Sequence, residues 1–230
     1  MQKTYPYRSF LLSPSIMYYY FCLLSIFFGF LPLGLFLILK NKLRKDTFSI
    51  LPYLALTFFA SFYELVFTVI LKIDASVWFK IYTSIEFFVL IHYFYKLLKG
   101  KYKYLFIFFG LLYSCSFGII IYQGKIASFM DGDSYLQAIE SVFVISAIIL
   151  WMKYAFINLQ EDSLLKYPQF YFVTGLLFYF SGTLFLFMLG SVILENMEEQ
   201  YFLDMWILNQ FFNIFFKILL LTGIWKAQVK

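Results

Sequence analysis

Seven long apolar stretches, separated by short polar segments, limit what this sequence can fold into. They run over about 15–39, 47–71, 77–98, 104–122, 134–157, 168–193 and 201–225. Each has the roughly 20 residues that an α-helix needs to cross a bilayer. The stretches are continuously apolar, and a lipid-exposed backbone must satisfy its own hydrogen bonds, which favours helices over a barrel. We therefore predict an all-α membrane protein, a bundle of seven transmembrane helices that forms one transmembrane domain over residues 1–230.

The composition argues against a soluble protein. Hydrophobic residues make up 63% of the chain and charged residues 13%, about half the usual share in soluble domains. A soluble fold of this size could not bury so much apolar surface. The first stretch is too long for the apolar region of a signal peptide, and no small-residue cleavage site follows it, so we expect a retained helix.

The basic residues between the stretches predict the orientation. Twelve fall on one side of the expected membrane: Lys40, Lys42, Arg44, Lys45, Lys96, Lys99, Lys101, Lys103, Lys153, Lys166, Lys226 and Lys230. Five fall on the other side: Lys3, Arg8, Lys72, Lys80 and Lys125. The second side also holds seven acids: Asp74, Asp131, Asp133, Glu195, Glu198, Glu199 and Asp204. The positive-inside rule makes the basic side cytoplasmic, with the N-terminus outside and the C-terminus inside. This placement accounts for the net charge of +5, and we expect no nucleic-acid partner.

Three glutamates fall inside the predicted spans, where an ionisable side chain costs about 2–3 kcal/mol or more and by default marks a functional site. From the rise of the helix, Glu64, Glu86 and Glu140 lie roughly 10, 13 and 9 Å from the outer ends of their spans. All three therefore belong to the outer half of the bundle. Glu64 has small and polar neighbours at helical spacing, and Tyr82 shares a face with Glu86. These patterns indicate that the glutamates point into the bundle.

The last span carries a matching polar stripe. Asn209, Asn213 and Lys217 are spaced by four and so stack on one side of a helix. Helical side chains tilt toward the N-terminus, so Lys217 is expected to lean toward the depth of Glu86. Together these observations predict a ligand or ion pocket in the outer half, lined by Glu64, Tyr82, Glu86, Glu140, Asn209, Asn213 and Lys217. The alternative is a structural network of interhelical hydrogen bonds, each worth about 0.6 kcal/mol.

The sequence contains no residue pattern that indicates a metal site or a reactive thiol. His92 is the one histidine, so no histidine-based metal cluster can form, and we expect no metal or other cofactor. Cys22 and Cys115 both lie inside apolar stretches, where thiols pack as small hydrophobic groups.

Two weaker patterns concern helix packing. Gly175, Tyr179 and Gly182 share one face of the sixth span, which would let another helix approach closely. Ile85-Glu86 and Ile139-Glu140 open similar apolar stretches on the third and fifth spans. We interpret this internal echo as coincidence, since two residues are too few to show a repeat.

Three motifs stand out: Tyr-Thr-x-x-Glu at Tyr82–Glu86, the glutamate at Glu140, and Tyr-Phe-Ser-Gly at Tyr179–Gly182. With the stretches 81–99, 171–187 and 209–226, they resemble a group of uncharacterised bacterial multi-pass integral membrane proteins of the Bacteroidota type. The resemblance covers most of the chain from about residue 40. The resemblance implies a protein of the bacterial inner membrane with about seven helices. It does not imply any particular activity.

Two functions from different classes fit these patterns. The first is a binding or signalling membrane protein, in which a small ligand enters the outer-half pocket and the basic loops contact a cytoplasmic or membrane protein partner. The second is a proton- or cation-coupled transporter or channel that uses the glutamates, with a polar path continuing inward through His92.

Two further classes are poorly supported. A seven-helix metal hydrolase needs several histidines, and this chain has one. A retinal protein would use Lys217 with Glu86, but that comparison rests on topology alone. We expect no catalytic residue and no enzyme activity.

Overall fold

The computed structural model describes residues 16–73, 75–123, 133–158, 163–196 and 199–229. Within these residues it has seven α-helices: α2 (Ile16–Leu39), α3 (Leu51–Tyr63), α4 (Ser76–Leu97), α5 (Lys103–Tyr122), α6 (Asp133–Asn158), α7 (Pro168–Asn196) and α8 (Glu199–Lys226). The predicted all-α fold is confirmed. Asp131, which the sequence analysis counts among the acids of the expected outer side, lies outside the described residues.

The second predicted span differs most from the structure. A 3-10 segment, η2 (Lys45–Ile50), precedes α3, so the α-helix begins at Leu51 instead of residue 47. Pro52 occupies the first turn of α3, where its missing N–H costs nothing. Beyond α3 the chain continues as a π-helix, η3 (Glu64–Ile70). Such wide turns are often found at functional sites.

Six helical segments in the described part of the chain are long and apolar enough to cross a membrane. The chain is thus a multi-pass membrane protein by the length and composition of its helices. Six of the seven predicted spans thus correspond to helical segments with the length and apolarity for a crossing, and the seventh crossing stays a prediction. The remaining helix, α4, carries Lys80, Glu86 and Lys96 and is not among the six.

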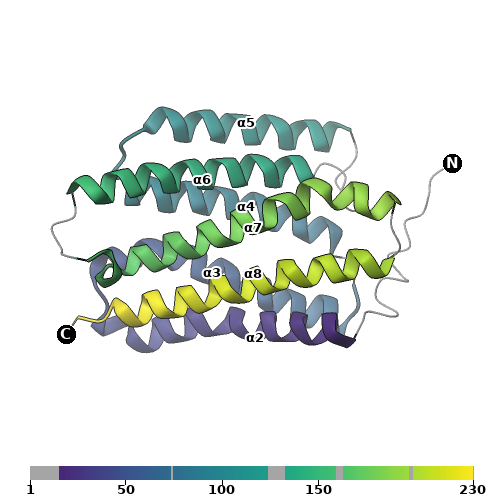
Figure 1. Cartoon of the computed structure of the whole chain (residues 1–230), viewed down its shortest axis with the longest axis horizontal. Coiled ribbons are helices and arrows are strands. Elements are labelled where there is room, and N and C mark those ends of the chain that lie inside the picture. Colours follow the sequence, from purple (N-terminus) through teal and green to yellow (C-terminus); the bar gives the residue numbers. More distant parts are fainter. Residues whose placement is uncertain (1–15, 74, 124–132, 159–162, 197–198, 230) are drawn as a thin grey trace.

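The helices run alternately up and down the bundle, and each contacts the next one in the chain (Figure 1). Helices that are not consecutive in the chain also pack together, among them α2 with α8 and α4 with α6. The helices α2, α3, α4, α6, α7 and α8 therefore form a closed ring. Helix α5 lies outside this ring, against α4 and α6 (Figure 1).

The basic loops meet at one end of the bundle, which we call the basic end. There the backbone N–H of Val229 donates to the carbonyl oxygen of Lys42 at 2.8 Å, and that of Arg44 donates to Ala227 at 3.1 Å. These bonds tie the segment that follows α8 to the turn between α2 and α3. Lys99, in the turn after α4, lies over the ring of Tyr154 on α6.

The contact between α7 and α8 depends on glycines. A Cβ atom on Gly175 would lie 2.7 Å from Cδ2 of Phe216, and one on Gly182 would lie 2.5 Å from Cε1 of Phe212. These distances leave no room for a side chain, so the aromatic rings of α8 sit directly on the backbone of α7. The predicted close approach along the face of Gly175 and Gly182 is confirmed.

Candidate functional site

Glu86 is held inside the bundle by two tyrosines. Its side chain is 3% exposed. The hydroxyl of Tyr53 on α3 donates to Oε1 of Glu86 at 2.7 Å, and the hydroxyl of Tyr82, one turn earlier on α4, donates to the same oxygen at 3.1 Å. Two phenol donors on one oxygen are the arrangement that suits a carboxylate, which only accepts hydrogen bonds.

Glu140 on α6 is the most deeply buried acid of the site. Its side chain is 0% exposed, and neither carboxyl oxygen has a hydrogen-bond partner among the described residues. It lies within electrostatic range of Glu86. Buried polar groups are nearly always paired, so a carboxyl group with both oxygens unpaired needs an explanation.

A hydrogen bond between α4 and α6 shows that Glu86 and Glu140 lie at the same height along the two helices. Nε2 of Gln137 on α6 donates to Oγ1 of Thr83 on α4 at 3.3 Å, and these residues are 54 positions apart. Glu86 and Glu140 each follow one helical turn later, so they face each other across two parallel helices. The echo of Ile85-Glu86 in Ile139-Glu140 therefore falls at facing positions in the structure.

Tyr179 on α7 is the third tyrosine of the site. It lies within electrostatic range of Glu64, Glu86 and Glu140. Its ring stacks on Phe216, 5.8 Å between centroids, and Phe216 also contacts the ring of Tyr53 at 5.7 Å. We call Glu86, Glu140, Tyr53, Tyr82 and Tyr179 the carboxyl–tyrosine cluster. Next along the same two helices, the buried rings of Phe87 on α4 and Phe143 on α6 contact each other, with centroids 5.5 Å apart.

Lys217 takes a partner that the sequence analysis did not anticipate. The side chain is 5% exposed, and its Nζ donates to the carbonyl oxygen of Ser25 at 2.8 Å and to Oγ of Ser25 at 3.2 Å. It is within electrostatic range of Glu64 and Glu86. Lys217 therefore binds α2 directly and acts on the acids only through space.

The other predicted pocket residues lie outside the hydrogen bonds of the cluster. Glu64 is half-buried at the start of η3, and Asn213 is half-buried on α8. Asn209 is 8% exposed, and its Oδ1 has no partner among the described residues. In the described part of the chain, no hydrogen bond joins either asparagine to the glutamates. His92 is exposed, so it does not extend the cluster inward.

Sequence reasoning missed Tyr53 and Ser25 and treated Tyr179 as a packing residue. The chain has 20 tyrosines, so no single one stands out by composition. The available signal was the Tyr-Phe-Ser-Gly motif, which begins at Tyr179. For Tyr53 and Ser25 the sequence contains no comparable signal.

The site has no metal-type ligand set, since no three His, Cys, Asp or Glu residues in the described ranges come together in a way that could hold a metal ion. Comparisons with models of known protein families, with curated proteins and with solved structures found no match. The class of the protein is therefore defined by its own geometry. It is a helical multi-pass membrane protein with a buried carboxyl–tyrosine cluster.

Proposed function

We propose that this membrane protein takes up a proton, or a small cation in its place, between Glu86 and Glu140, and that this uptake drives transport across the membrane. The observation that supports the proposal is the pair of unpartnered oxygens on the fully buried Glu140. This reading takes precedence over small-ligand binding because a proton or cation directly supplies what the carboxyl group lacks.

Burying the charges of both acids in the bundle is costly. Two carboxylates close together in a low dielectric do not both stay ionised without a compensating charge. Glu86 already accepts from Tyr53 and Tyr82, whereas Glu140 has no donor among the described side chains. A proton on Glu140, or a cation between the two acids, removes the repulsion. The tyrosine hydroxyls can both donate and accept, which suits a relay beside a proton site.

The proposal also includes an orientation and a location. Basic loops gather at one end of the bundle, and twelve basic residues against five on the other side support a cytoplasmic basic end. The resemblance to bacterial multi-pass proteins supports the inner membrane. An N-terminus outside and a C-terminus inside then follow from the alternating helices.

The test is infrared spectroscopy of the purified protein in lipid vesicles during a change of pH. We expect a carbonyl band of a protonated carboxyl group that appears and disappears with pH. Glu140→Gln and Glu86→Gln should remove or shift this band. Glu64→Gln is the matched control, because Glu64 lies outside the hydrogen bonds of the cluster, and should leave it in place.

A flux measurement then tests transport. Vesicles that contain a pH-sensitive dye should dissipate an imposed pH difference faster with the wild-type protein than with Glu140→Gln. Two results together would overturn the proposal: the same rate of pH dissipation with wild type and with Glu140→Gln, and a carbonyl band that Glu140→Gln leaves unchanged.

Small-ligand binding with signalling is the second candidate. It is favoured by Asn209, whose buried Oδ1 has no donor in the described part of the chain and lies two turns before Lys217 on α8. A ligand with a hydrogen-bond donor would satisfy this oxygen. A ligand that raises the melting temperature of the wild type but not of Asn209→Leu would support this candidate.

A further inference from the structure

A cavity of about 590 Å³ opens at the basic end of the bundle. Four segments line it: η2, the last turn of α4 with the turn that follows, the end of α6, and the first residues of α7 with the residue before it. None of its lining residues belongs to the carboxyl–tyrosine cluster. Trp151 and Ala155, which are 4% and 2% exposed, make its buried floor.

The rim of this cavity is positively charged. Lys45 comes from η2, and Lys96 and Lys99 come from the end of α4 and the turn after it. In the ranges that the structure describes, these three lysines form no ion pair. Nζ of Lys99 lies 5.8 Å from the centre of the Tyr154 ring, which itself lines the cavity. A cation held over an aromatic face in this way stays at the wall of the cavity.

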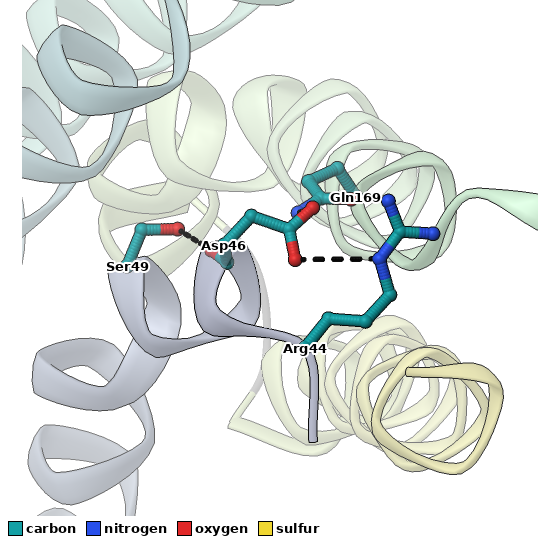
Figure 2. Close-up of polar contacts among 4 residues, drawn as sticks. All are labelled: Arg44, Asp46, Ser49 and Gln169. Atoms are coloured by element: carbon teal, nitrogen blue, oxygen red, sulfur yellow. Dashed lines mark hydrogen bonds and ion pairs between the residues drawn. The ribbon is translucent and has the colours of Figure 1, made fainter. Parts of the chain in front are cut away.

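Asp46 is the one acid on the wall, and its carboxylate is already engaged. Nε of Arg44 lies 3.6 Å from Oδ1, and Nε2 of Gln169 donates to Oδ2 at 2.8 Å. Figure 2 shows Asp46 between these two side chains. Because Arg44 compensates the charge of Asp46, the three lysines leave the cavity with a positive balance.

Gln169 supplies a second, independent pointer to a ligand. The side chain is 5% exposed, and its Oε1 has no hydrogen-bond partner among the described residues. A carboxylate only accepts hydrogen bonds, so Nε2 must face Asp46 and Oε1 must be the free acceptor. A ligand that satisfies it needs a donor, such as a hydroxyl group.

We propose that this cavity binds a phosphate-bearing anion that also carries a hydroxyl donor. The phosphate would lie among Lys45, Lys96 and Lys99, since lysine binds phosphate as a point charge. The hydroxyl group would reach Gln169 below the rim. Basic pockets between membrane helices on the cytoplasmic side are suited to anionic lipid headgroups. The same chemistry is found in a soluble phosphate ester, and the proposal does not depend on proton uptake at the glutamates.

Native mass spectrometry of the full chain in detergent tests this site, with short-chain phosphatidylglycerol as the probe. Lys96→Gln combined with Lys99→Gln should weaken binding about tenfold or more, from the loss of two cations near the phosphate. The matched control is Lys153→Gln combined with Lys226→Gln, which removes the same charge from exposed positions outside the cavity lining. It should change the affinity by less than about twofold. Circular dichroism checks that all forms are folded.

Competition separates the two sources of the ligand. Glycerol phosphate that displaces the lipid at similar concentration assigns the site to a soluble phosphate ester, and failure to displace it assigns the site to a lipid headgroup. Both results support a phosphate site. Equal loss of affinity in the two double variants would overturn it. So would binding of phosphatidylcholine, which has no hydroxyl donor and no net charge, as tightly as phosphatidylglycerol.

Discussion

Nζ of Lys217 on α8 lies 2.8 Å from the backbone carbonyl oxygen of Ser25 on α2 and donates a hydrogen bond to it. This bond joins the first and last helices of the described chain and so helps to close the ring. Gly29, one turn further along α2, leaves the space that the lysine needs, since a Cβ atom there would lie 3.3 Å from Nζ. The same Cβ would also lie 2.9 Å from Cβ of Ser61 on α3. Three helices therefore meet at this glycine.

Gly29→Ala is expected to destabilise the bundle by about 1–3 kcal/mol, because the added methyl group overpacks the junction of α2, α3 and α8. Gly34→Ala is the matched control on the same helix, where a Cβ atom meets nothing within 4 Å. It should be neutral or stabilising by up to about 1 kcal/mol, the helix propensity of alanine over glycine. Thermal unfolding in detergent measures both. Equal melting temperatures for the two variants would contradict the close approach at Gly29.

Helix positions were predictable because an apolar span must match the thickness of the bilayer. The fourth span, expected over 104–122, is observed as Lys103–Tyr122, and the last, expected over 201–225, is observed as Glu199–Lys226. The change to a π-helix at Glu64 was not predictable from apolar length. It alters the hydrogen-bond spacing of the backbone and leaves the hydropathy of the segment unchanged.

The site was predictable only in part, because depth along a helix and the residues that share one face can be read from sequence, whereas contacts between non-consecutive helices cannot. Glu86 and Glu140 were placed at similar depth, and they face each other because α4 contacts α6. The tilt of Lys217 toward the outer side follows from helix geometry. Its actual partner, Ser25, depends on the contact of α2 with α8, which chain order does not reveal.

Tyr53→Phe is expected to lower stability by about 1–2 kcal/mol, because it removes a hydrogen bond from the buried carboxyl group of Glu86. Tyr93→Phe is the matched control for Tyr53→Phe, because it also removes only a phenol hydroxyl group. Both side chains are 1% exposed, but the hydroxyl of Tyr93 has no hydrogen-bond partner among the described residues. Its loss should be neutral or stabilising. Chemical denaturation of the purified variants gives the comparison, and equal effects would show that the bond from Tyr53 contributes nothing.

The proposed orientation can be tested at the two ends of α5. In a background with Cys22 and Cys115 replaced by alanine, Lys101→Cys just before α5 should resist a membrane-impermeant thiol reagent in intact cells. Tyr122→Cys at the other end of the helix should react, since Tyr122 is 92% exposed and on the side we assign to the outside. Labelling of both positions after lysis shows that both are reactive. The reverse pattern in intact cells would put the basic end outside.

Glu86 offers the sharpest test of whether the cluster is a network. Glu86→Gln keeps an oxygen that can accept from Tyr53 and Tyr82, so its stability should stay within about 1 kcal/mol of the wild type. Glu86→Leu has similar volume but leaves the buried hydroxyl of Tyr53 and the half-buried hydroxyl of Tyr82 without an acceptor. The cost of a buried unsatisfied donor is about 1–3 kcal/mol. We therefore expect Glu86→Leu to melt well below Glu86→Gln in the same detergent.

The double variant Glu86→Leu with Tyr53→Phe makes this prediction specific. Because Tyr53→Phe removes one of the stranded donors, it should restore part of the stability that Glu86→Leu loses, and the two changes should not add. Additive effects would mean that the 2.7 Å hydrogen bond between Tyr53 and Glu86 contributes nothing to stability. Equal stability of the Glu86→Gln and Glu86→Leu variants would contradict the hydrogen-bond network. It would mean that the hydrogen bonds from Tyr53 and Tyr82 to Glu86 do not stabilise the protein.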